Sequence, residues 1–199
     1  MAEVILKIIC AAVLTVAGSL WINKLYSGSK ELTFPKKISS RARFRVPILF
    51  FALTILFNAT DDLFSMAAIF LLVLMTLTDF EQYMLFDAMT FPLIVLSAVY
   101  AWQNSALAEN CFAALVGGGI FAAIVIISRG ALGGGDVKLI FALGLWLGTE
   151  KFFNVVLLGT IAGGVAATAM ILLKKKTRRS YFAYGPYFTL AAIYFLLSA

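Results

Sequence analysis

The sequence predicts an all-α, polytopic transmembrane helix bundle with about eight spans. Hydrophobic residues make up 62% of the 199 residues, and the mean hydropathy is +0.98. The apolar residues come in long runs separated by short polar breaks. Soluble domains are about half apolar, whereas such runs are typical of membrane helices. We interpret residues 1–199 as a single membrane-embedded domain, because the longest polar stretch, residues 24–45, is too short to fold alone.

The polar breaks divide the chain into its expected spans. In order, these are residues 4–26, 46–58, 63–78, 88–102, 111–127, 137–147, 152–173 and 181–198. Several are shorter than the ~20 residues of a standard span. The second and sixth have the weakest signal, so either their flanks complete them or they are partial helices inside the bundle. The first run also has a cleavage-like "VAGS", but its start is barely basic and more spans follow, which favours a retained helix over a signal peptide.

Lysine and arginine predict the orientation. The loops after the first and seventh spans are rich in these residues, and with eight spans both loops fall on one side: Lys24, Lys30, Lys36, Lys37, Arg41, Arg43 and Arg45, then Lys174, Lys175, Lys176, Arg178 and Arg179. Residues 58–62 and 103–110 carry acids and no bases. The positive-inside rule places the basic side in the cytoplasm and both termini outside the plasma or inner membrane. For basic loops beside a bilayer, setting the orientation of the protein in the membrane is a better explanation than nucleic-acid binding.

Two aspartates predict a site on the cytoplasmic side. Asp79 ends the third span and Asp136 opens the sixth, so the topology places both at the same face. A carboxylate at a membrane boundary is costly and usually has a partner or a chemical role. Capping a helix is the simpler role for either one alone, above all for Asp136. As a close pair, one ionised and one protonated, they have the chemistry to activate a water and polarise a carbonyl.

Three glycines, Gly133, Gly134 and Gly135, precede Asp136. Without side chains they let an extended peptide approach the backbone and bind in strand form. A phosphate-binding loop is the alternative, but no strand precedes the glycines and no GK[ST] follows them. The chain has no His and only two Cys, far apart, which argues against Ser-His-Asp triads and zinc clusters. We therefore expect no metal and no cofactor.

Several stretches resemble a known family. "GALGGGDVKL", residues 130–139, is similar to the GxGD motif of the type IV prepilin peptidases, which are membrane aspartic proteases. "TDFEQYMLFDAMTFPL", residues 78–93, resembles the family segment that holds the other aspartate. Residues 18–23 ("GSLWIN"), 38–57 and 184–191 ("YGPYFTLA") resemble further family stretches, so the similarity covers nearly the whole chain.

The resemblance implies a GxGD-type aspartic protease that cleaves the basic leader peptides of type IV prepilins or pseudopilins at the cytoplasmic membrane face. It makes Asp79 and Asp136 the catalytic pair and gives Asp87 a supporting role. The three glycines are expected to align an unwound substrate, and Lys138 to orient their loop. Glu81 matches no clear family role, and we expect a solvated loop charge that helps Asp87 to steer the basic leader.

The chain departs from this family in one loop. Full-length bacterial members carry a domain after the first helix in which two CxxC pairs hold zinc. In bifunctional members this region accompanies methylation of the new amino terminus by S-adenosylmethionine. Residues 24–45 contain no Cys, so we expect a short form without methyltransferase activity.

Two other functions stay open on the sequence. A transporter or channel would use Asp79 and Asp136 as proton or cation ligands, and the broken helix at "GGGD" favours it. However, no inverted repeat is visible, and both acids are predicted at one face instead of the midplane. A structural membrane subunit would leave the GxGD stretch unexplained. The expected partners are a prepilin-like substrate with a transmembrane helix and the lipid bilayer, and no nucleic acid.

Overall fold

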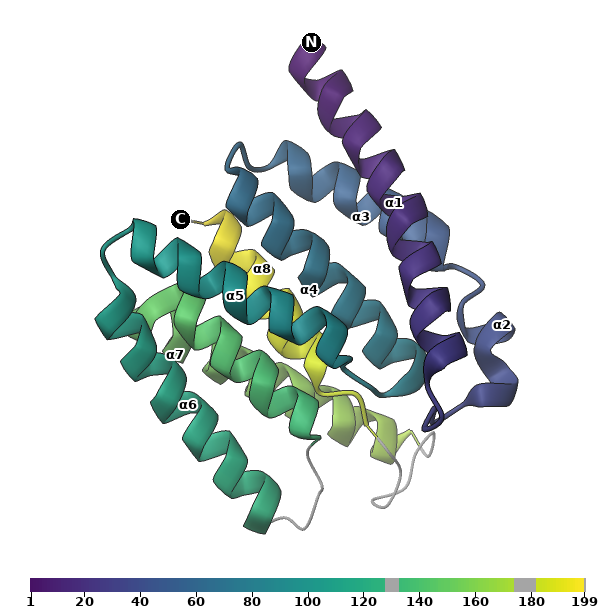
Figure 1. The fold of residues 1–199 in the computed structure, drawn as a ribbon. Helices are drawn as coiled ribbons and strands as arrows, with labels where there is room; N and C mark the ends of the chain where they lie inside the picture. The colour runs from purple at the N-terminus through teal and green to yellow at the C-terminus, as the bar shows by residue number, and fades with distance from the viewer. Residues whose placement is uncertain (128–132, 174–181, 199) are drawn as a thin grey trace.

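The computed structural model of the chain describes residues 1–127, 133–173 and 182–198, and over these residues it contains helices and no strands. The helices are α1 (Ala2–Gly28), the short 3-10 helix η1 (Pro35–Lys37), α2 (Ile38–Arg41), α3 (Arg45–Asn58), α4 (Leu63–Gln82), α5 (Asp87–Gln103), α6 (Leu107–Ile127), α7 (Gly134–Leu172) and α8 (Gly185–Leu197). Four of them, α1, α4, α6 and α7, are long and apolar enough to cross a membrane, and α3 and α8 are shorter apolar helices. The predicted membrane helix bundle is confirmed (Figure 1).

Helix α7 contains the sixth and seventh expected spans, and the chain reverses between them at Gly148. The backbone there has φ 69° and ψ −179°, a combination that is essentially confined to glycine. A Cβ at Gly117 of α6 would lie 2.2 Å from Phe152 Cζ and 3.4 Å from Ile140 Cγ2. Residues from both arms therefore lie against the same point of α6, so the arms run side by side as a hairpin.

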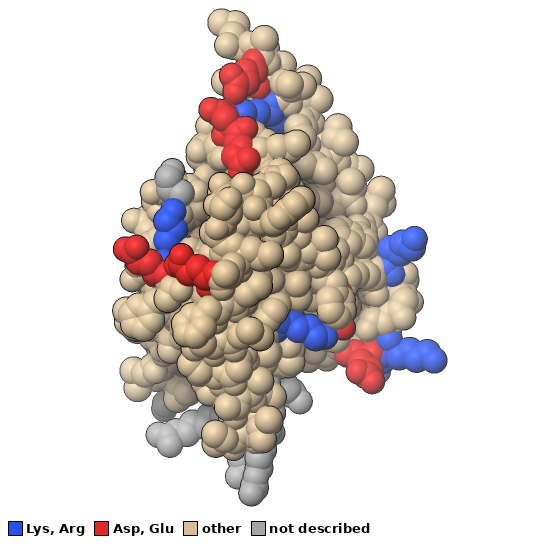
Figure 2. Space-filling view, turned by 60° about the vertical axis from the view of Figure 1, so that its left-hand side comes forward, with Lys and Arg blue, Asp and Glu red and all other residues tan. Residues whose placement is uncertain are grey.

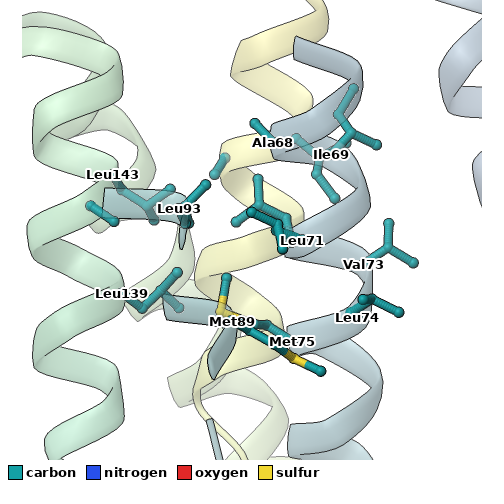
Figure 3. Packing of buried hydrophobic residues seen from close by; sticks show 14 of the residues in the cluster. Ala68, Ile69, Leu71, Val73, Leu74, Met75, Met89, Leu93, Leu139 and Leu143 are labelled. Carbon is teal, nitrogen blue, oxygen red and sulfur yellow. The ribbon is translucent and has the colours of Figure 1, made fainter. Parts of the chain in front are cut away.

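Helix α4 lies at the centre of the bundle, in contact with α3, α5 and α8. Asp62 begins the helix as its N-cap, where its carboxylate accepts hydrogen bonds from the backbone N–H groups of Phe64 and Ser65. An apolar run follows, and most of the helix is buried. In Figure 3, Leu71 and Met75 of α4 lie on the side of α5 and α7, whereas Ile69, Val73 and Leu74 point the opposite way, and all of them belong to one buried cluster.

The loops gather at two ends of the bundle, which we call the Asp79 end and the Lys7 end. At the Lys7 end, the Lys7 amino group of α1 donates to the Thr60 carbonyl oxygen at 3.0 Å and pairs with Asp61. A pocket of about 560 Å³ lies there between the 59–62 and 104–106 loops, the α7 turn and the end of α8. Both termini lie at this end (Figure 1). The Asp79 end holds residues 29–44 and 83–86 and the starts of α7 and α8.

This arrangement agrees with the relative topology that the sequence predicts. The acidic loops 58–62 and 103–110 lie with the termini, and residues 29–44 lie at the other end, beside the segment that contains Asp79. Figure 2 shows charged side chains towards the ends and a broad uncharged surface between them. Of the predicted basic loops, residues 174–179 lie outside the described residues.

Candidate active site

Asp79 lies in the last turn of α4, at the end of the apolar run. The helix stops after Gln82 because Tyr83 adopts a left-handed conformation (φ 57°, ψ 40°), from which its N–H donates to the Asp79 carbonyl oxygen at 2.8 Å. Asp79 is only 5% exposed, and its Oδ2 makes no hydrogen bond to a described residue, although the backbone N–H of Gly185 faces the carboxyl group. Leaving a buried carboxylate oxygen unpaired is costly, so such an atom calls for a functional explanation.

Asp136 is the third residue of α7. Its Oδ2 accepts a hydrogen bond from the N–H of Gly133, the N-cap residue, at 3.1 Å, and its own N–H donates to the Gly133 carbonyl oxygen at 3.1 Å. The helix-capping role considered for Asp136 is therefore present, but it is exerted from the first turn instead of the N-cap position. The positive end of the helix dipole favours a carboxylate at this place. Capping thus orients the carboxylate towards the Asp79 end.

The fold brings the two aspartates together. A Cβ at Gly185, which lies against Asp79, would be 3.4 Å from Leu85 Cδ1, and a Cβ at Gly135, which precedes Asp136, would be 2.8 Å from Leu85 Cβ, so the segments that carry the two acids meet at Leu85. About one helical turn away from them, Met75 of α4, Met89 of α5 and Leu139 of α7 are fully buried in the shared core (Figure 3). Helix α5 contacts both α4 and α7, so it connects the two helices that carry the acids.

Gly185, the first residue of α8, lies directly against Asp79. A Cβ at this position would be 2.7 Å from Asp79 Oδ2 and 3.3 Å from its Cγ. One turn further along, the buried hydroxyls of Thr76 and Thr189 hydrogen-bond at 2.7 Å, which fixes the register of α8 on α4. In the sequence, Gly185 belongs to the "YGPYFTLA" stretch, and nothing there indicates a role for it. The family resemblance of this stretch was the only sequence signal that pointed to Gly185, because residues 184–191 lie far along the chain from both acidic segments.

The three glycines before Asp136 differ in their surroundings. A Cβ at Gly135 would lie 2.8 Å from Leu85 Cβ and 3.1 Å from the Leu85 carbonyl oxygen, whereas nothing lies within 4 Å of one at Gly134. A Cβ at Gly133 would meet Asp136 Oδ2 at 3.3 Å. The backbone that approaches Gly135 closely is the chain's own 83–86 segment, and binding of a substrate to the three glycines stays a prediction.

Asp87 and Lys138 form an ion pair beside the two aspartates. Asp87 is the first residue of α5, and the Lys138 amino group of α7 lies 2.5 Å from its Oδ1. Both side chains are partly exposed, 55% for Asp87 and 38% for Lys138. Lys138 also lies over the Phe91 ring, 5.2 Å from its centroid. The two residues expected to support the site therefore pair with each other, and their ion pair connects the start of α5 to the start of α7.

Glu81 is not the solvated loop charge that the sequence predicted. Helix α4 continues past residue 78 to Gln82, so Glu81 lies on the helix. Only 4% of it is exposed, and its carboxylate accepts hydrogen bonds from Arg45 Nε at 2.8 Å, Arg45 Nη2 at 2.5 Å and the Tyr26 hydroxyl at 2.9 Å. The expectation that Glu81 steers the substrate is also wrong, because its charge is enclosed and paired. Arg45, counted above as a loop base, is 3% exposed.

No three side chains of His, Cys, Asp or Glu come together within residues 1–127, 133–173 and 182–198. Among the described residues, Gly185 lies against Asp79 and Gly133 against Asp136. Independence from metal ions stays a prediction that a chelator tests.

A family model described as the type IV leader peptidase family matches residues 66–168, more than half of the chain. The chain belongs to this family. The matched region contains Asp79, Asp87 and Asp136, together with the glycines before Asp136. The family resemblance drawn from the sequence is thereby confirmed, and the chain is a multi-pass membrane protein of the leader peptidase family.

Curated relatives of this leader peptidase family member carry the name prepilin leader peptidase/N-methyltransferase. The protein from Aeromonas salmonicida (strain A449) is 29% identical over 127 residues, which cover 60% of this chain and 44% of that protein. The protein from Neisseria gonorrhoeae is 30% identical over 127 residues (60% and 43%), and that from Escherichia coli (strain K12) is 28% identical over 126 residues (60% and 56%). The chain thus spans about half the length of the curated relatives it matches. No solved structure matches it.

Proposed function

We propose that this chain is a membrane aspartic endopeptidase that cleaves the basic leader peptides of type IV prepilins or pilin-like proteins. The observation that carries the proposal is the meeting of Asp79 and Asp136 at one end of the bundle, with Oδ2 of Asp79 buried and unpaired among the described side chains. Membership of the leader peptidase family supports the substrate class.

Two neighbouring carboxylates suffice for peptide hydrolysis. The ionised one takes a proton from a water as the water oxygen attacks the scissile carbonyl carbon, and the protonated one donates its proton to the carbonyl oxygen. The tetrahedral intermediate then collapses, the C–N bond breaks, and the leaving amine takes up a proton. Glycines on either side, Gly185 at Asp79 and Gly133 at Asp136, keep side chains away from the reacting oxygens.

The position of the pair supports a substrate that enters from the membrane. Asp79 and Asp136 lie at the end of the bundle that carries Lys24, Lys30, Lys36, Lys37 and Arg43, which the positive-inside rule assigns to the cytoplasm. A substrate helix beside the bundle would place its leader at this boundary, where the leader must unwind to expose its carbonyl groups. Of the two acids expected to attract the basic leader, Glu81 and Asp87, only Asp87 is exposed to solvent and can do so.

The same placement makes a transporter the weaker alternative. Ion sites of secondary transporters lie near the bilayer midplane at the interface of repeats, whereas both aspartates lie at one end of the bundle. We also propose that the cleaved product keeps an unmodified amino terminus, because residues 24–45 contain no Cys to build a zinc-bearing domain. Mass spectrometry of product formed with S-adenosylmethionine present tests this, since a methyl group would contradict it.

Replacing the aspartates one at a time tests the proposal. Purified Asp79→Asn and Asp136→Asn proteins, incubated in detergent with a pilin-like substrate, should each cleave at least about 1,000-fold more slowly than wild type, since general acid–base groups contribute about 10²–10⁴-fold. Glu109→Gln, at the Lys7 end, is the matched carboxylate control and should cleave normally. Cleavage should persist with EDTA. Near-normal cleavage by either Asn variant, with a Tm like that of wild type, would overturn the assignment.

A further inference from the structure

We propose that Glu81 and Arg45 are positioning residues, whose buried ion pair holds the last turn of α4 and thereby aims Asp79. This inference rests on the proposed peptidase function. It also replaces the role that the sequence suggested for Glu81, because a residue that steers the substrate must face the solvent and this one faces α1 and α3.

The ion pair joins three helices inside the protein. The side chains of Arg45 (α3) and Glu81 (α4) are 2% and 5% exposed, and the two guanidinium nitrogens Nε and Nη2 donate to separate carboxylate oxygens. From α1, the Tyr26 hydroxyl donates to Glu81 Oε2, and Asn23 Oδ1 accepts from Arg45 Nη1 at 2.6 Å. Two parallel hydrogen bonds between a guanidinium and a carboxylate fix the relative direction of the two side chains as well as the distance between them. The last turn of α4 is therefore held against α1 and α3.

A second arginine holds the backbone of the same turn. Arg41 Nε donates to the Glu81 carbonyl oxygen at 2.5 Å, and Arg41 Nη2 donates to the Phe80 carbonyl oxygen at 2.6 Å. Its guanidinium lies 4.2 Å from the Phe34 ring centroid and 5.1 Å from that of Tyr83. The last carbonyls of a helix have no partner within it and favour a cation. Arg41 thus satisfies the carbonyls that follow Asp79 in the chain.

This clamp acts on Asp79 because Asp79 and Glu81 share one helical turn. Residues two apart on a helix point in nearly opposite directions, so holding Glu81 towards α1 and α3 turns Asp79 towards Gly185 and Asp136. Replacing a buried ion pair by neutral residues is often neutral for stability, whereas removing one partner leaves an unpaired buried charge. The pair's contribution to function can therefore be separated from its contribution to folding.

The experiment compares wild type with Arg45→Met and with the double variant Arg45→Met/Glu81→Gln, in full-length purified protein. We expect Arg45→Met to lower both Tm and kcat. In the double variant the Tm should recover, because no unpaired charge remains, while kcat stays about 100-fold below wild type with KM within about twofold, since a displacement of ~1 Å in an active site can cost that much. Lys7→Met, which breaks an ion pair at the other end, is the control and should keep kcat.

Amide hydrogen exchange gives a readout that does not depend on cleavage. In the double variant, peptides that cover residues 79–83 should exchange faster, while those from the middle of α4 should not change. A wild-type kcat in the double variant would overturn the inference, and so would a raised KM with unchanged kcat, which would make Glu81 a substrate-binding residue. If wild type cleaves no pilin-like substrate, or Asp79→Asn remains active, the proposed function fails instead, and the exchange data still test the clamp.

Tyr26→Phe tests the same clamp if the double variant does not fold. It removes only the hydroxyl that donates to Glu81 Oε2 and keeps the ring, which packs 5.8 Å from the Phe86 ring centroid. Losing one hydrogen bond to a charged group should lower kcat about threefold and leave KM unchanged. Wild-type kcat together with wild-type exchange at residues 79–83 would overturn the inference.

Discussion

Ion pairs join helices or loops at both ends of the bundle, and the Arg45–Glu81 and Lys7–Asp61 pairs differ in their surroundings. At the Asp79 end, the side chains of Arg45 and Glu81 are 2% and 5% exposed; Glu81 accepts a hydrogen bond from Tyr26, and Arg45 donates one to Asn23. At the Lys7 end, the side chain of Lys7 is 12% exposed and that of Asp61 83% exposed. Exposed pairs contribute little to stability, whereas breaking a buried pair is strongly destabilising.

Glycines pack closely at both ends, but against different groups. At the Lys7 end, where loops surround a pocket of about 560 Å³, a Cβ added at Gly148 would lie 2.8 Å from the amide oxygen of Asn110. At the Asp79 end, a Cβ added at Gly185 would lie 2.7 Å from Asp79 Oδ2. Tight packing with buried polar pairs costs conformational freedom, and at the Asp79 end it surrounds the two carboxylates to which we assign catalysis. Substitutions at the Asp79 end should therefore change catalysis, and those at the Lys7 end should not.

The largest effect after loss of the aspartates should come from Gly185→Ala. Its Cβ would lie 2.7 Å from Asp79 Oδ2, so the carboxylate must rotate away while the helices stay in place. We expect kcat to fall about 100-fold with little change in Tm. Gly164→Ala on α7, where nothing lies within 4 Å of the new Cβ, is the matched control. A Gly185→Ala enzyme with wild-type kcat would show that Asp79 needs no open space on this side.

Gly135→Ala should be the next most damaging change. The new Cβ would meet the Leu85 backbone oxygen at 3.1 Å, and a backbone cannot move aside as a side-chain end can. We expect kcat to fall about tenfold and Tm to fall as well, because the 83–86 segment has to shift. Gly134→Ala has open space and a helical position that suits alanine. Loss of cleavage in Gly134→Ala at unchanged Tm would instead indicate that substrate contacts the glycines.

The long helices, and the end of the bundle at which the two acids lie, could be predicted from the sequence because they depend on local patterns. Apolar runs and their polar breaks located the long helices, including the interruption of α7 that Gly148 makes, but not the short helices η1 and α2 inside the polar loop. Alternation of the loops was enough to place Asp79 and Asp136 at one end. Both inferences use residues that are neighbours along the chain.

The contacts that position Asp79 could not be predicted from the sequence, because they join residues that are far apart along the chain. Glu81 and Arg45 each look like ordinary charges next to a membrane helix, and only their meeting in the fold makes them a buried pair. The end of α4 was placed too early, at residue 78, because the polar residues that follow interrupt the apolar run although the helix continues to Gln82. Gly185 faces Asp79 only after α8 packs on α4.

The Asp87–Lys138 pair should give an intermediate effect, because it lies at the Asp79 end but is partly exposed. Asp87→Asn and Lys138→Met should each lower kcat/KM about two- to fivefold, in line with the modest strength of exposed ion pairs. The double variant should be no worse than either single one, since each change removes the same contact. If the Asp87→Asn effect is larger than that of Lys138→Met and is confined to KM, then Asp87 contacts the basic leader directly.

The smallest effect is expected from the Lys7–Asp61 pair. The hydrogen bond from Lys7, together with its charge, lowers the pKa of the Asp61 carboxyl. A carboxyl whose pKa is lowered by folding stabilises the fold above its ordinary pKa, near 4, and this contribution is lost as the pH falls through the lowered value. Asp61→Asn should therefore lower Tm by about 2 °C or less at pH 7, and by still less at low pH, because Asp61 is exposed to solvent. Its kcat and KM should equal those of wild type at every pH, and a change in kcat would show that the two ends of the bundle are coupled.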